Sequence, residues 1–335
     1  MSNSPIIAEN LVRHFGDVHA VKGINLDIKA GEVFGFLGPN GAGKSTAVRM
    51  LTTLLRPTSG TARVAGFDVV TQADQVRRNI GVALQDAAID PLMTGTELLA
   101  LQAVLYGIPT AAVKKRSDEL LERVGLTAAA SRRVSTYSGG MRRRLDLALS
   151  LIHQPTVLFL DEPTTGLDPM SRLTLWEEVR RLNREGTTVM LTTQYLEEVD
   201  QLADRIAIID HGKIVREGKP AELKASVGAP TLIINTNIDQ AEKAKLVLST
   251  FGDLRPGAEG ALGVGLRGGA SQVTEVVRKL DEAGVHVQHL EINEPSLDDV
   301  FAEATGYRLE GADNAPPAGD NGDDEPKKKK RRGRK

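Results

Sequence analysis

The sequence FGFLGPNGAGKST, residues 34–46, runs from a short apolar segment through a glycine-rich loop to a lysine and two hydroxyl residues. The apolar run Val33 to Leu37 has the length of a buried strand. The spacing of Val48 and Leu51 predicts a helix that begins at Lys44. Backbone N–H groups of such a loop, together with the positive end of the helix, can hold phosphate groups. The predicted phosphate-binding residues are Gly38, Pro39, Asn40, Gly41, Ala42, Gly43, Lys44, Ser45 and Thr46.

A second segment, VLFLDEP at residues 157–163, places two adjacent carboxylates after an apolar run. Such a pair on a surface loop would mean little by itself. Beside a phosphate loop, we expect Asp161 and the Ser45 hydroxyl to hold Mg²⁺, Lys44 to reach the outer phosphates, and Glu162 to orient and deprotonate the attacking water. The predicted chemistry is therefore that of a bound nucleoside triphosphate.

A third segment, YSGGMRRRLDLALSLI at residues 137–152, has the apolar spacing of a helix. Ser138, Gly139 and Gly140 stand at its start, where a hydroxyl and open N–H groups meet the positive end of the helix. They form either an ordinary helix cap or a second anion site. Because one nucleotide seldom needs two phosphate cradles, we infer that this group completes the site of another copy of the chain.

Composition excludes several other classes of protein. The chain has no cysteine, so disulfides, thiolate zinc sites and cysteine nucleophiles are ruled out. Only 4% of the residues are aromatic, which disfavours base-stacking surfaces for single-stranded nucleic acid. No apolar run approaches the roughly 18 residues of a membrane span, and no export signal is expected.

The order of patterns predicts an α/β protein. Short β-like runs alternate with helical runs up to about residue 220, which is typical of a parallel sheet covered by helices. The first residues favour an antiparallel β layer, and residues 96–125 favour a helical insert. The order after residue 220 is β-α-β-β-α-β, which predicts a small ferredoxin-like α+β domain. The expected regions are a nucleotide-binding domain at 1–222 with its insert at about 90–150, an accessory domain at 223–310, and a disordered tail at 311–335.

The tail is acidic and then basic. Residues 312–335 hold eight Lys and Arg against five Asp and Glu. The net charge of the whole chain is −2, so the rest of the chain has a net charge of −5. The basic end either contacts anionic lipid or nucleic acid or is simply solvated.

The motifs together resemble those of the ATP-binding subunits of ABC transporters, in the order of that family. They are the phosphate loop at 38–46, Gln85 in VALQD, YSGGM at 137–141, LDEP at 160–163 and GLDP at 166–169. Met141 stands where the family's signature has glutamine. The resemblance implies an ATP site shared by two subunits, in which Ser138 to Gly140 of one copy cap the ATP held by Lys44 of the other, with Asp168 at the seam. It also implies that Gln85 contacts ATP and the metal.

The resemblance further gives Phe15 the place of the aromatic residue that stacks on adenine. Without it, Phe15 near Val12 and Val18 would be read as the core of a hairpin.

Gln194, in LTTQYLEE at residues 191–198, departs from the family. Most members have a histidine there that contacts the γ-phosphate. A glutamine amide can donate a hydrogen bond to phosphate, but it cannot carry a proton. We therefore expect Gln194 to sense the γ-phosphate through one neutral hydrogen bond, with Glu162 as the base; the alternative is that Gln194 only caps the next helix.

Three longer segments resemble the DrrA-type, daunorubicin-resistance branch of drug-export ATPases: YSGGMRRRLDLA, LTTQYLEEVDQLADRIAIIDHG and EPSLDDVF. The resemblance implies a homodimer, at the cytoplasmic face of the membrane, that hydrolyses ATP and powers export of a hydrophobic drug through a separate integral membrane permease. No nucleic-acid partner is then expected, and the basic tail could contact anionic lipid. The alternative is a soluble ABC ATPase that acts on nucleic acid or ribosomes.

Overall fold

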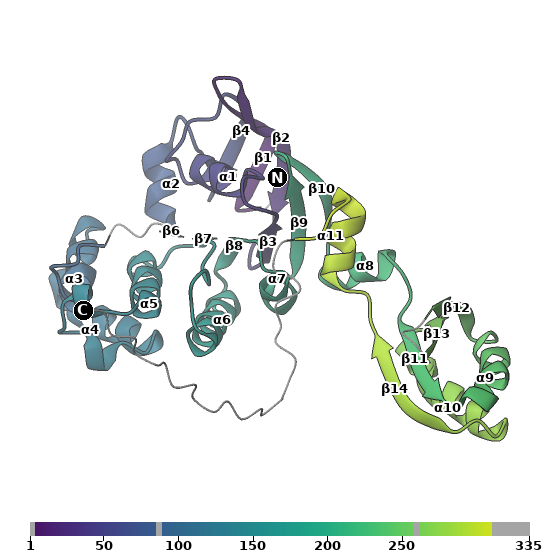
Figure 1. The fold of residues 1–335 in the computed structure, drawn as a ribbon. Coiled ribbons are helices and arrows are strands. Elements are labelled where there is room, and N and C mark those ends of the chain that lie inside the picture. The colour runs from purple at the N-terminus through teal and green to yellow at the C-terminus, as the bar shows by residue number, and fades with distance from the viewer. Residues whose placement is uncertain (1–3, 85–88, 257–260, 310–335) are drawn as a thin grey trace, which may run out of the picture.

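A computed structural model describes residues 4–84, 89–256 and 261–309 of the chain (Figure 1). Gln85 and the tail at 311–335 lie outside these ranges, so their predicted roles stay predictions. The fold is of the α/β class, as predicted, and the described residues form three sheets. Within the described ranges, no helix combines the length and the apolarity needed to cross a bilayer.

The central sheet has six strands in the order β10-β9-β3-β8-β7-β6. All neighbours are parallel except β10, which pairs antiparallel with β9. Strands β3 and β7 are buried along their whole length, because their apolar side chains face helices or a second sheet on either side. The strands are β3 Val33–Leu37, β6 Ile80–Ala83, β7 Val157–Asp161, β8 Thr188–Thr193, β9 Arg205–Asp210 and β10 Lys213–Gly218.

Two hydrophobic cores lie on the two faces of this sheet. Phe34 and Phe36 point toward the antiparallel sheet and helix α1, whereas Val33 and Leu37 point toward the other helices. The helices of this part are α1 Lys44–Leu51, α2 Ala73–Asn79, α5 Gly139–Ser150, α6 Pro169–Arg184, α7 Leu196–Leu202 and α8 Pro220–Ser226. Successive side chains of β3 therefore pack into the two cores, and this packing fixes the position of the glycine-rich loop that follows β3.

The predicted antiparallel layer is present. Its four strands have the order β2-β1-β4-β5, and β1 pairs with both β2 and β4. They are β1 Ile6–Phe15, β2 Val18–Ile28, β4 Ser59–Val64 and β5 Phe67–Asp68.

The helical insert consists of α3 (Gly95–Leu105) and α4 (Thr110–Arg123), which pack against α5. Thr94 and Glu97 form a reciprocal capping box at the start of α3. The break between α3 and α4 contains Gly107 and Pro109. Short 3-10 turns at Thr127–Ala129 and Val134–Thr136 lead from α4 to α5.

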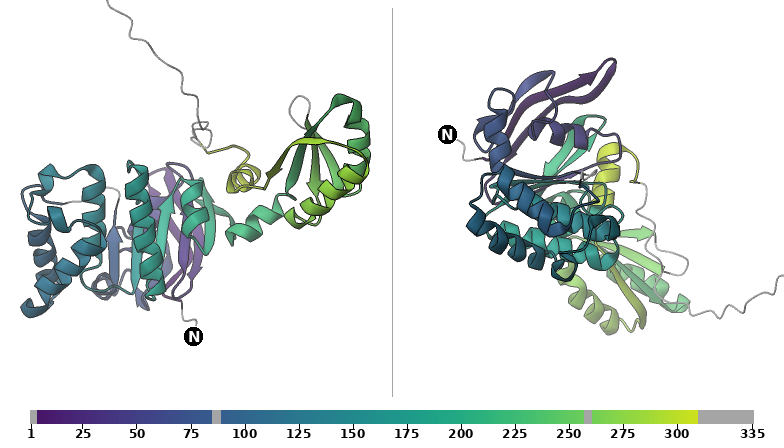
Figure 2. Two further views of the ribbon diagram at one scale, coloured as in Figure 1. Left: turned by 90° about the horizontal axis from the view of Figure 1, so that it is seen from below. Right: turned by 90° about the vertical axis from the view of Figure 1, so that its left-hand side faces the viewer.

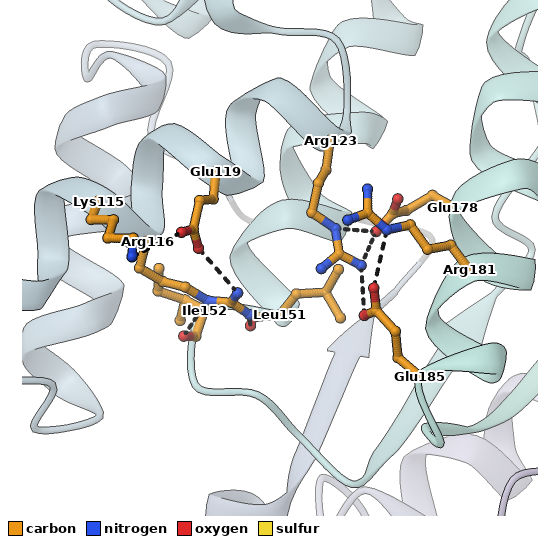
Figure 3. A network of polar contacts seen from close by, with 9 residues as sticks. All are labelled: Lys115, Arg116, Glu119, Arg123, Leu151, Ile152, Glu178, Arg181 and Glu185. Atoms are coloured by element: carbon orange, nitrogen blue, oxygen red, sulfur yellow. Dashed lines mark hydrogen bonds and ion pairs between the residues drawn. The ribbon is translucent and has the colours of Figure 1, made fainter.

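Polar contacts tie the insert to the central core (Figure 3). Arg123 of α4 lies 2.6 Å from Glu178 and 3.1 Å from Glu185, both at α6. Arg116 donates to the carbonyl oxygens of Leu151 and Ile152, which follow α5. The insert is thus bonded to α6 through Arg123 and to the end of α5 through Arg116.

The last sheet forms a separate unit beside the rest of the molecule (Figure 2). Its strand order is β12-β13-β11-β14 with all pairs antiparallel, and α9 and α10 cover one face. This order of a β-α-β-β-α-β unit is that of a ferredoxin-like fold, as predicted. The elements are β11 Thr231–Thr236, α9 Ala241–Leu248, β12 Gly252–Pro256, β13 Ala261–Leu266, α10 Val273–Glu282 and β14 Val287–Asn293, with 3-10 turns at Ile238–Gln240 and Ala270–Gln272.

The terminal helix α11 (Leu297–Thr305) is capped by Ser296, whose side chain accepts from the N–H of Asp299. It does not pack on the ferredoxin-like sheet. Leu297, Val300 and Phe301 instead join the core that contains α6 and α7, so the chain leaves the nucleotide-binding body and returns to it. The exact limits given above for the regions of the chain stay predictions.

Candidate functional site

The glycine-rich loop follows β3 and leads into α1 at Lys44, as predicted. Gly43 has a φ of 107°, and a Cβ atom there would lie 2.4 Å from the carbonyl oxygen of Ala20. Both observations require glycine at this position. The loop encloses a cavity of about 220 Å³. Its walls are Ala20, Pro39, Asn40, Gly41, Gly43, Lys44, Ser45, Thr46 and Glu162.

Lys44 is buried at the edge of this cavity. Its Nζ donates to the carbonyl oxygens of Gly38 at 2.7 Å and Pro39 at 3.0 Å, and it lies 3.4 Å from Oε1 of Glu162. Burial lowers the pKa of Lys44, while the charges of Glu162 and Asp161 oppose that shift. A lysine held this way still presents its charge to a phosphate that enters the cavity.

Ser45 and Asp161 come together from two elements, α1 and the end of β7. The Ser45 hydroxyl donates to Oδ1 of Asp161 at 3.1 Å, and the Thr192 hydroxyl of β8 donates to the same oxygen. A hydroxyl and a carboxylate beside a phosphate cradle suit Mg²⁺, which uses few carboxylates and completes its shell with phosphate and water.

Glu162 follows Asp161 in an unusual backbone conformation. Its φ is 48°, a left-handed conformation that costs a non-glycine residue about 1–3 kcal/mol. The Glu162 N–H donates to the carbonyl of Thr192 at 3.0 Å, and the Thr165 hydroxyl lies 3.4 Å from Oε2. The turn directs this carboxylate into the cavity that Lys44 borders.

The residues predicted to serve a second copy lie at two helix starts. Ser138 caps α5 by accepting from the N–H of Met141, and a Cβ atom on Gly140 would lie 2.8 Å from the Ser171 hydroxyl. Asp168 caps α6 by accepting from the N–H of Ser171 at 3.0 Å and from its hydroxyl at 2.6 Å. Those bonds lower the pKa of Asp168. Ser138, Gly139, Gly140 and Asp168 do not line the cavity around Lys44.

Gln194 lies half-buried between β8 and α7. Its side chain makes no hydrogen bond to another residue within the described ranges, and α7 has no side-chain cap. Within the described ranges, the amide thus makes no capping hydrogen bond to α7. Phe15 ends β1 as a residue that is 46% exposed, with the Arg13 guanidinium 4.5 Å from the ring centre, which is a more open setting than a hairpin core.

A groove separates α2 and the central sheet from the helical insert. It consists of two adjoining cavities of about 690 and 360 Å³. Arg77, Gln102, Tyr106 and His153 line both of them, and the rings of Tyr106 and His153 stack with centres 3.7 Å apart. Asp146 lies in the smaller cavity, where burial raises its pKa to about 7.

Sequence patterns missed two residues of the site. Thr192 reaches Asp161 because the strands β7 and β8 pair these two positions. Arg143 of α5 reaches the carbonyl oxygens of Asp161 and Pro163. The register of two predicted strands could have indicated Thr192. Arg143 is the middle one of three consecutive arginines, and nothing in the sequence distinguishes it from the other two.

Known families and proteins match this architecture. A family model described as ABC transporter matches residues 21–165, and one described as ATP-binding protein DrrA1-3-like, C-terminal domain, matches residues 218–305. The daunorubicin/doxorubicin resistance ATP-binding protein DrrA of Streptomyces peucetius is 47% identical, over 90% of this chain and 92% of that protein. The linearmycin resistance ATP-binding protein LnrL of Bacillus subtilis is 37% identical, over 90% and 98%.

Solved structures agree with the sequence relatives. The structure of cbiO1 from Clostridium perfringens, part of the ABC transporter complex cbiONQ, matches with a TM-score of 0.61 and 30% identity, over 67% of this chain and 91% of that one. A dimeric ATP-binding cassette in a post-hydrolysis state with ADP and Pi matches with a TM-score of 0.59 and 27% identity, over 64% and 98%. The phosphate loop, the two carboxylates and these likenesses together show that the chain belongs to the ATP-binding proteins of the ABC transporter family, in the DrrA-type branch.

Proposed function

We propose that the chain is the ATP-hydrolysing motor of an exporter that moves a hydrophobic drug or antibiotic through a separate membrane permease. The observation that carries the proposal is that Lys44, Ser45 and Glu162 line one cavity and that Ser45 donates to Asp161 behind it. The choice of a drug follows the relatives, which are named as daunorubicin, doxorubicin and linearmycin resistance proteins. None of the relatives named here is described as acting on nucleic acid or ribosomes, so the alternative gains no support.

The four residues divide the work of hydrolysis. Lys44 and the loop N–H groups bind the phosphates of ATP, and Gln194 donates to the γ-phosphate. Ser45 and Asp161 would hold Mg²⁺, with Gln85 as a further predicted ligand; the ion supplies positive charge that neutralises the phosphates. Glu162 takes a proton from the attacking water while the water oxygen bonds to the γ-phosphorus and the bond to the leaving ADP oxygen breaks.

A second copy would complete each site. Ser138, Gly139 and Gly140 stand at a helix start outside the cavity around Lys44, as a group meant for another subunit would. We assign Asp168 to the seam between the two copies and Phe15 to the adenine. One matched cassette was solved as a dimer bound to ADP and Pi, which supports this arrangement.

The permease would dock in the groove beside the insert. The outer side of α3 exposes Leu101, Val104 and Leu105 next to the two cavities, so an apolar helix has a surface to cover. The bound permease would hold the chain at the cytoplasmic face of the membrane.

The first test is Glu162→Gln, with steady-state phosphate release and nucleotide binding measured on the same sample. We expect the rate to fall by about 100-fold or more with ATP binding kept, because only the proton acceptor is removed. Glu197→Gln is the control, since Glu197 is an exposed carboxylate of α7 that does not line the cavity around Lys44. An unchanged rate in Glu162→Gln would show that another group is the base.

Transport itself requires the partner. The chain would be expressed with the permease of the adjacent reading frame, and doxorubicin uptake into inside-out vesicles would be followed with and without ATP. ATP-dependent uptake that Glu162→Gln abolishes is the expected result. The proposed drug substrate class is wrong if the vesicles hydrolyse ATP but take up neither doxorubicin nor daunorubicin.

A further inference from the structure

Arg143 lies in the first turns of α5, the helix that begins at the Ser138 group. Its side chain is only 10% exposed, and its guanidinium donates to three main-chain carbonyl oxygens. Nε bonds to Pro163 at 3.1 Å, Nη2 bonds to Asp161 at 2.6 Å, and Nη1 bonds to Leu84. One side chain of α5 thus bonds to two segments that are far from it in the sequence, at Leu84 and at residues 161–163.

Two of these carbonyls flank Glu162. Asp161 precedes it and Pro163 follows it, so the guanidinium bridges the residue in the strained left-handed conformation. On its N–H side the same residue is fixed by Thr192 of β8. The direction of the Glu162 carboxylate therefore depends on contacts from α5 as well as from β8.

The two neighbouring arginines do different things. Arg142 is exposed and donates to the Tyr137 carbonyl, and Arg144 donates to the carbonyls of Val124 and Gly125 after α4. Both contacts stay within the helical part of the molecule. Of the three arginines, only Arg143 reaches the segment around Glu162 within the described ranges.

We propose that Arg143 is a positioning residue for hydrolysis: it holds the backbone on both sides of Glu162 and fixes it to the helix whose start serves the second copy. The inference rests on the proposed function, because it needs Glu162 as the base. It gives α5 a direct mechanical connection to the proton acceptor. A shift of this helix when two copies meet would move the carboxylate with it.

The test is a double-mutant cycle with Arg143→Met, Glu162→Gln and the two combined. Single-turnover hydrolysis gives the rate, a fluorescent ATP analogue gives the affinity, and thermal melting gives the folded fraction. We expect Arg143→Met to lower kcat by about tenfold or more, because a small displacement of the base is costly. The affinity should change by less than about twofold, since Lys44 and its loop are untouched. In the Glu162→Gln background, Arg143→Met should cause no further loss, because its effect passes through Glu162.

Two further variants separate positioning from stability. Arg143→Lys keeps the charge and much of the volume but cannot serve three carbonyls with one planar fork, so its kcat should fall between those of the parent and Arg143→Met. Arg144→Met removes the matching contact to the insert and should leave kcat within about twofold of the parent. If Arg143→Met does not fold, Arg143→Lys takes its place in the cycle.

The inference is overturned if the loss from the Arg143 variant is as large in Glu162→Gln as in the parent, or if Arg144→Met lowers kcat equally. Those results leave the proposed function intact. An unchanged rate in Glu162→Gln alone instead overturns the assignment of the base, and the positioning role falls with it.

Discussion

The ammonium of Lys44 lies 3.4 Å from a carboxylate oxygen of Glu162, and both side chains are buried. Lys44 comes from the loop after β3 and Glu162 from the end of β7, and β8 lies between these strands in the sheet. The pair therefore connects the group that binds phosphate with the group that would activate water. Since burial makes the interaction strong, a change in either charge should be felt by the other.

This pair predicts a pH effect on ATP affinity. Burial lowers the pKa of Lys44, and the Glu162 charge raises it. Glu162→Gln removes the raising influence, so Lys44 should lose its proton at a lower pH in the variant. The lysine binds phosphate only when protonated, so affinity should weaken with rising pH earlier in Glu162→Gln than in the parent. Titration of a fluorescent ATP analogue between pH 7 and 10 checks this, with Glu197→Gln as control; coincident curves would contradict it.

Gln194 gives a second prediction. Its amide has no hydrogen-bond partner within the described ranges, so Gln194→Ala should leave the thermal melting temperature nearly unchanged. Hydrolysis should fall roughly threefold to tenfold, as for loss of one neutral hydrogen bond to phosphate. Gln194→His should restore activity and add a dependence on pH near 6.5, because imidazole titrates there. If Gln194→Ala changes neither hydrolysis nor ATP-driven dimerisation, the residue is structural.

The phosphate loop could be predicted from sequence because its signals are contiguous. The strand Val33–Leu37, the glycines and the start of α1 at Lys44 follow one another within a dozen residues, and each has a local physical cause. The ferredoxin-like unit was equally accessible, since its order of elements fixes few possible sheets.

Contacts between distant segments could not be predicted in this way. Arg143 is one of three consecutive arginines, and only the packing of α5 against the end of β7 distinguishes it. The packing of α11 on the core that contains α6 and α7 is also non-local. Phe301 resembles any apolar residue of a terminal helix, and its burial there requires the chain to return after the whole ferredoxin-like unit.

The basic tail predicts binding to anionic membranes. Each Lys or Arg near such a surface contributes about 1 kcal/mol, and residues 312–335 hold eight of them against five acidic residues. Deletion of this segment should reduce sedimentation with phosphatidylserine vesicles at low salt and leave binding to phosphatidylcholine vesicles unchanged. The same reduction should follow from adding salt to the full chain. Full retention on the anionic vesicles after deletion would place the membrane contact elsewhere.

The contact between Arg123 and Glu178 predicts where the insert is most sensitive (Figure 3). Glu178 is buried and burial raises its pKa, while Arg123 opposes that shift from 2.6 Å. Arg123→Met keeps the volume but leaves a buried carboxylate without its partner, which should lower the free energy of unfolding by about 3 kcal/mol at pH 8. Urea unfolding followed by circular dichroism measures the loss.

The sign of the pH dependence separates this explanation from simple loss of packing. Without Arg123 the pKa of Glu178 rises further, so the carboxyl becomes neutral on acidification and the cost of a buried charge disappears. The deficit of Arg123→Met should therefore shrink between pH 8 and pH 5. Arg181→Met is the matched control, because Arg181 pairs with the exposed Glu185 at 3.0 Å and its charge acts on Glu178 more weakly than that of Arg123, so the change should cost less than about 1 kcal/mol. A deficit that stays constant with pH, or one matched by Arg181→Met, would show that the charge of Glu178 does not depend on Arg123.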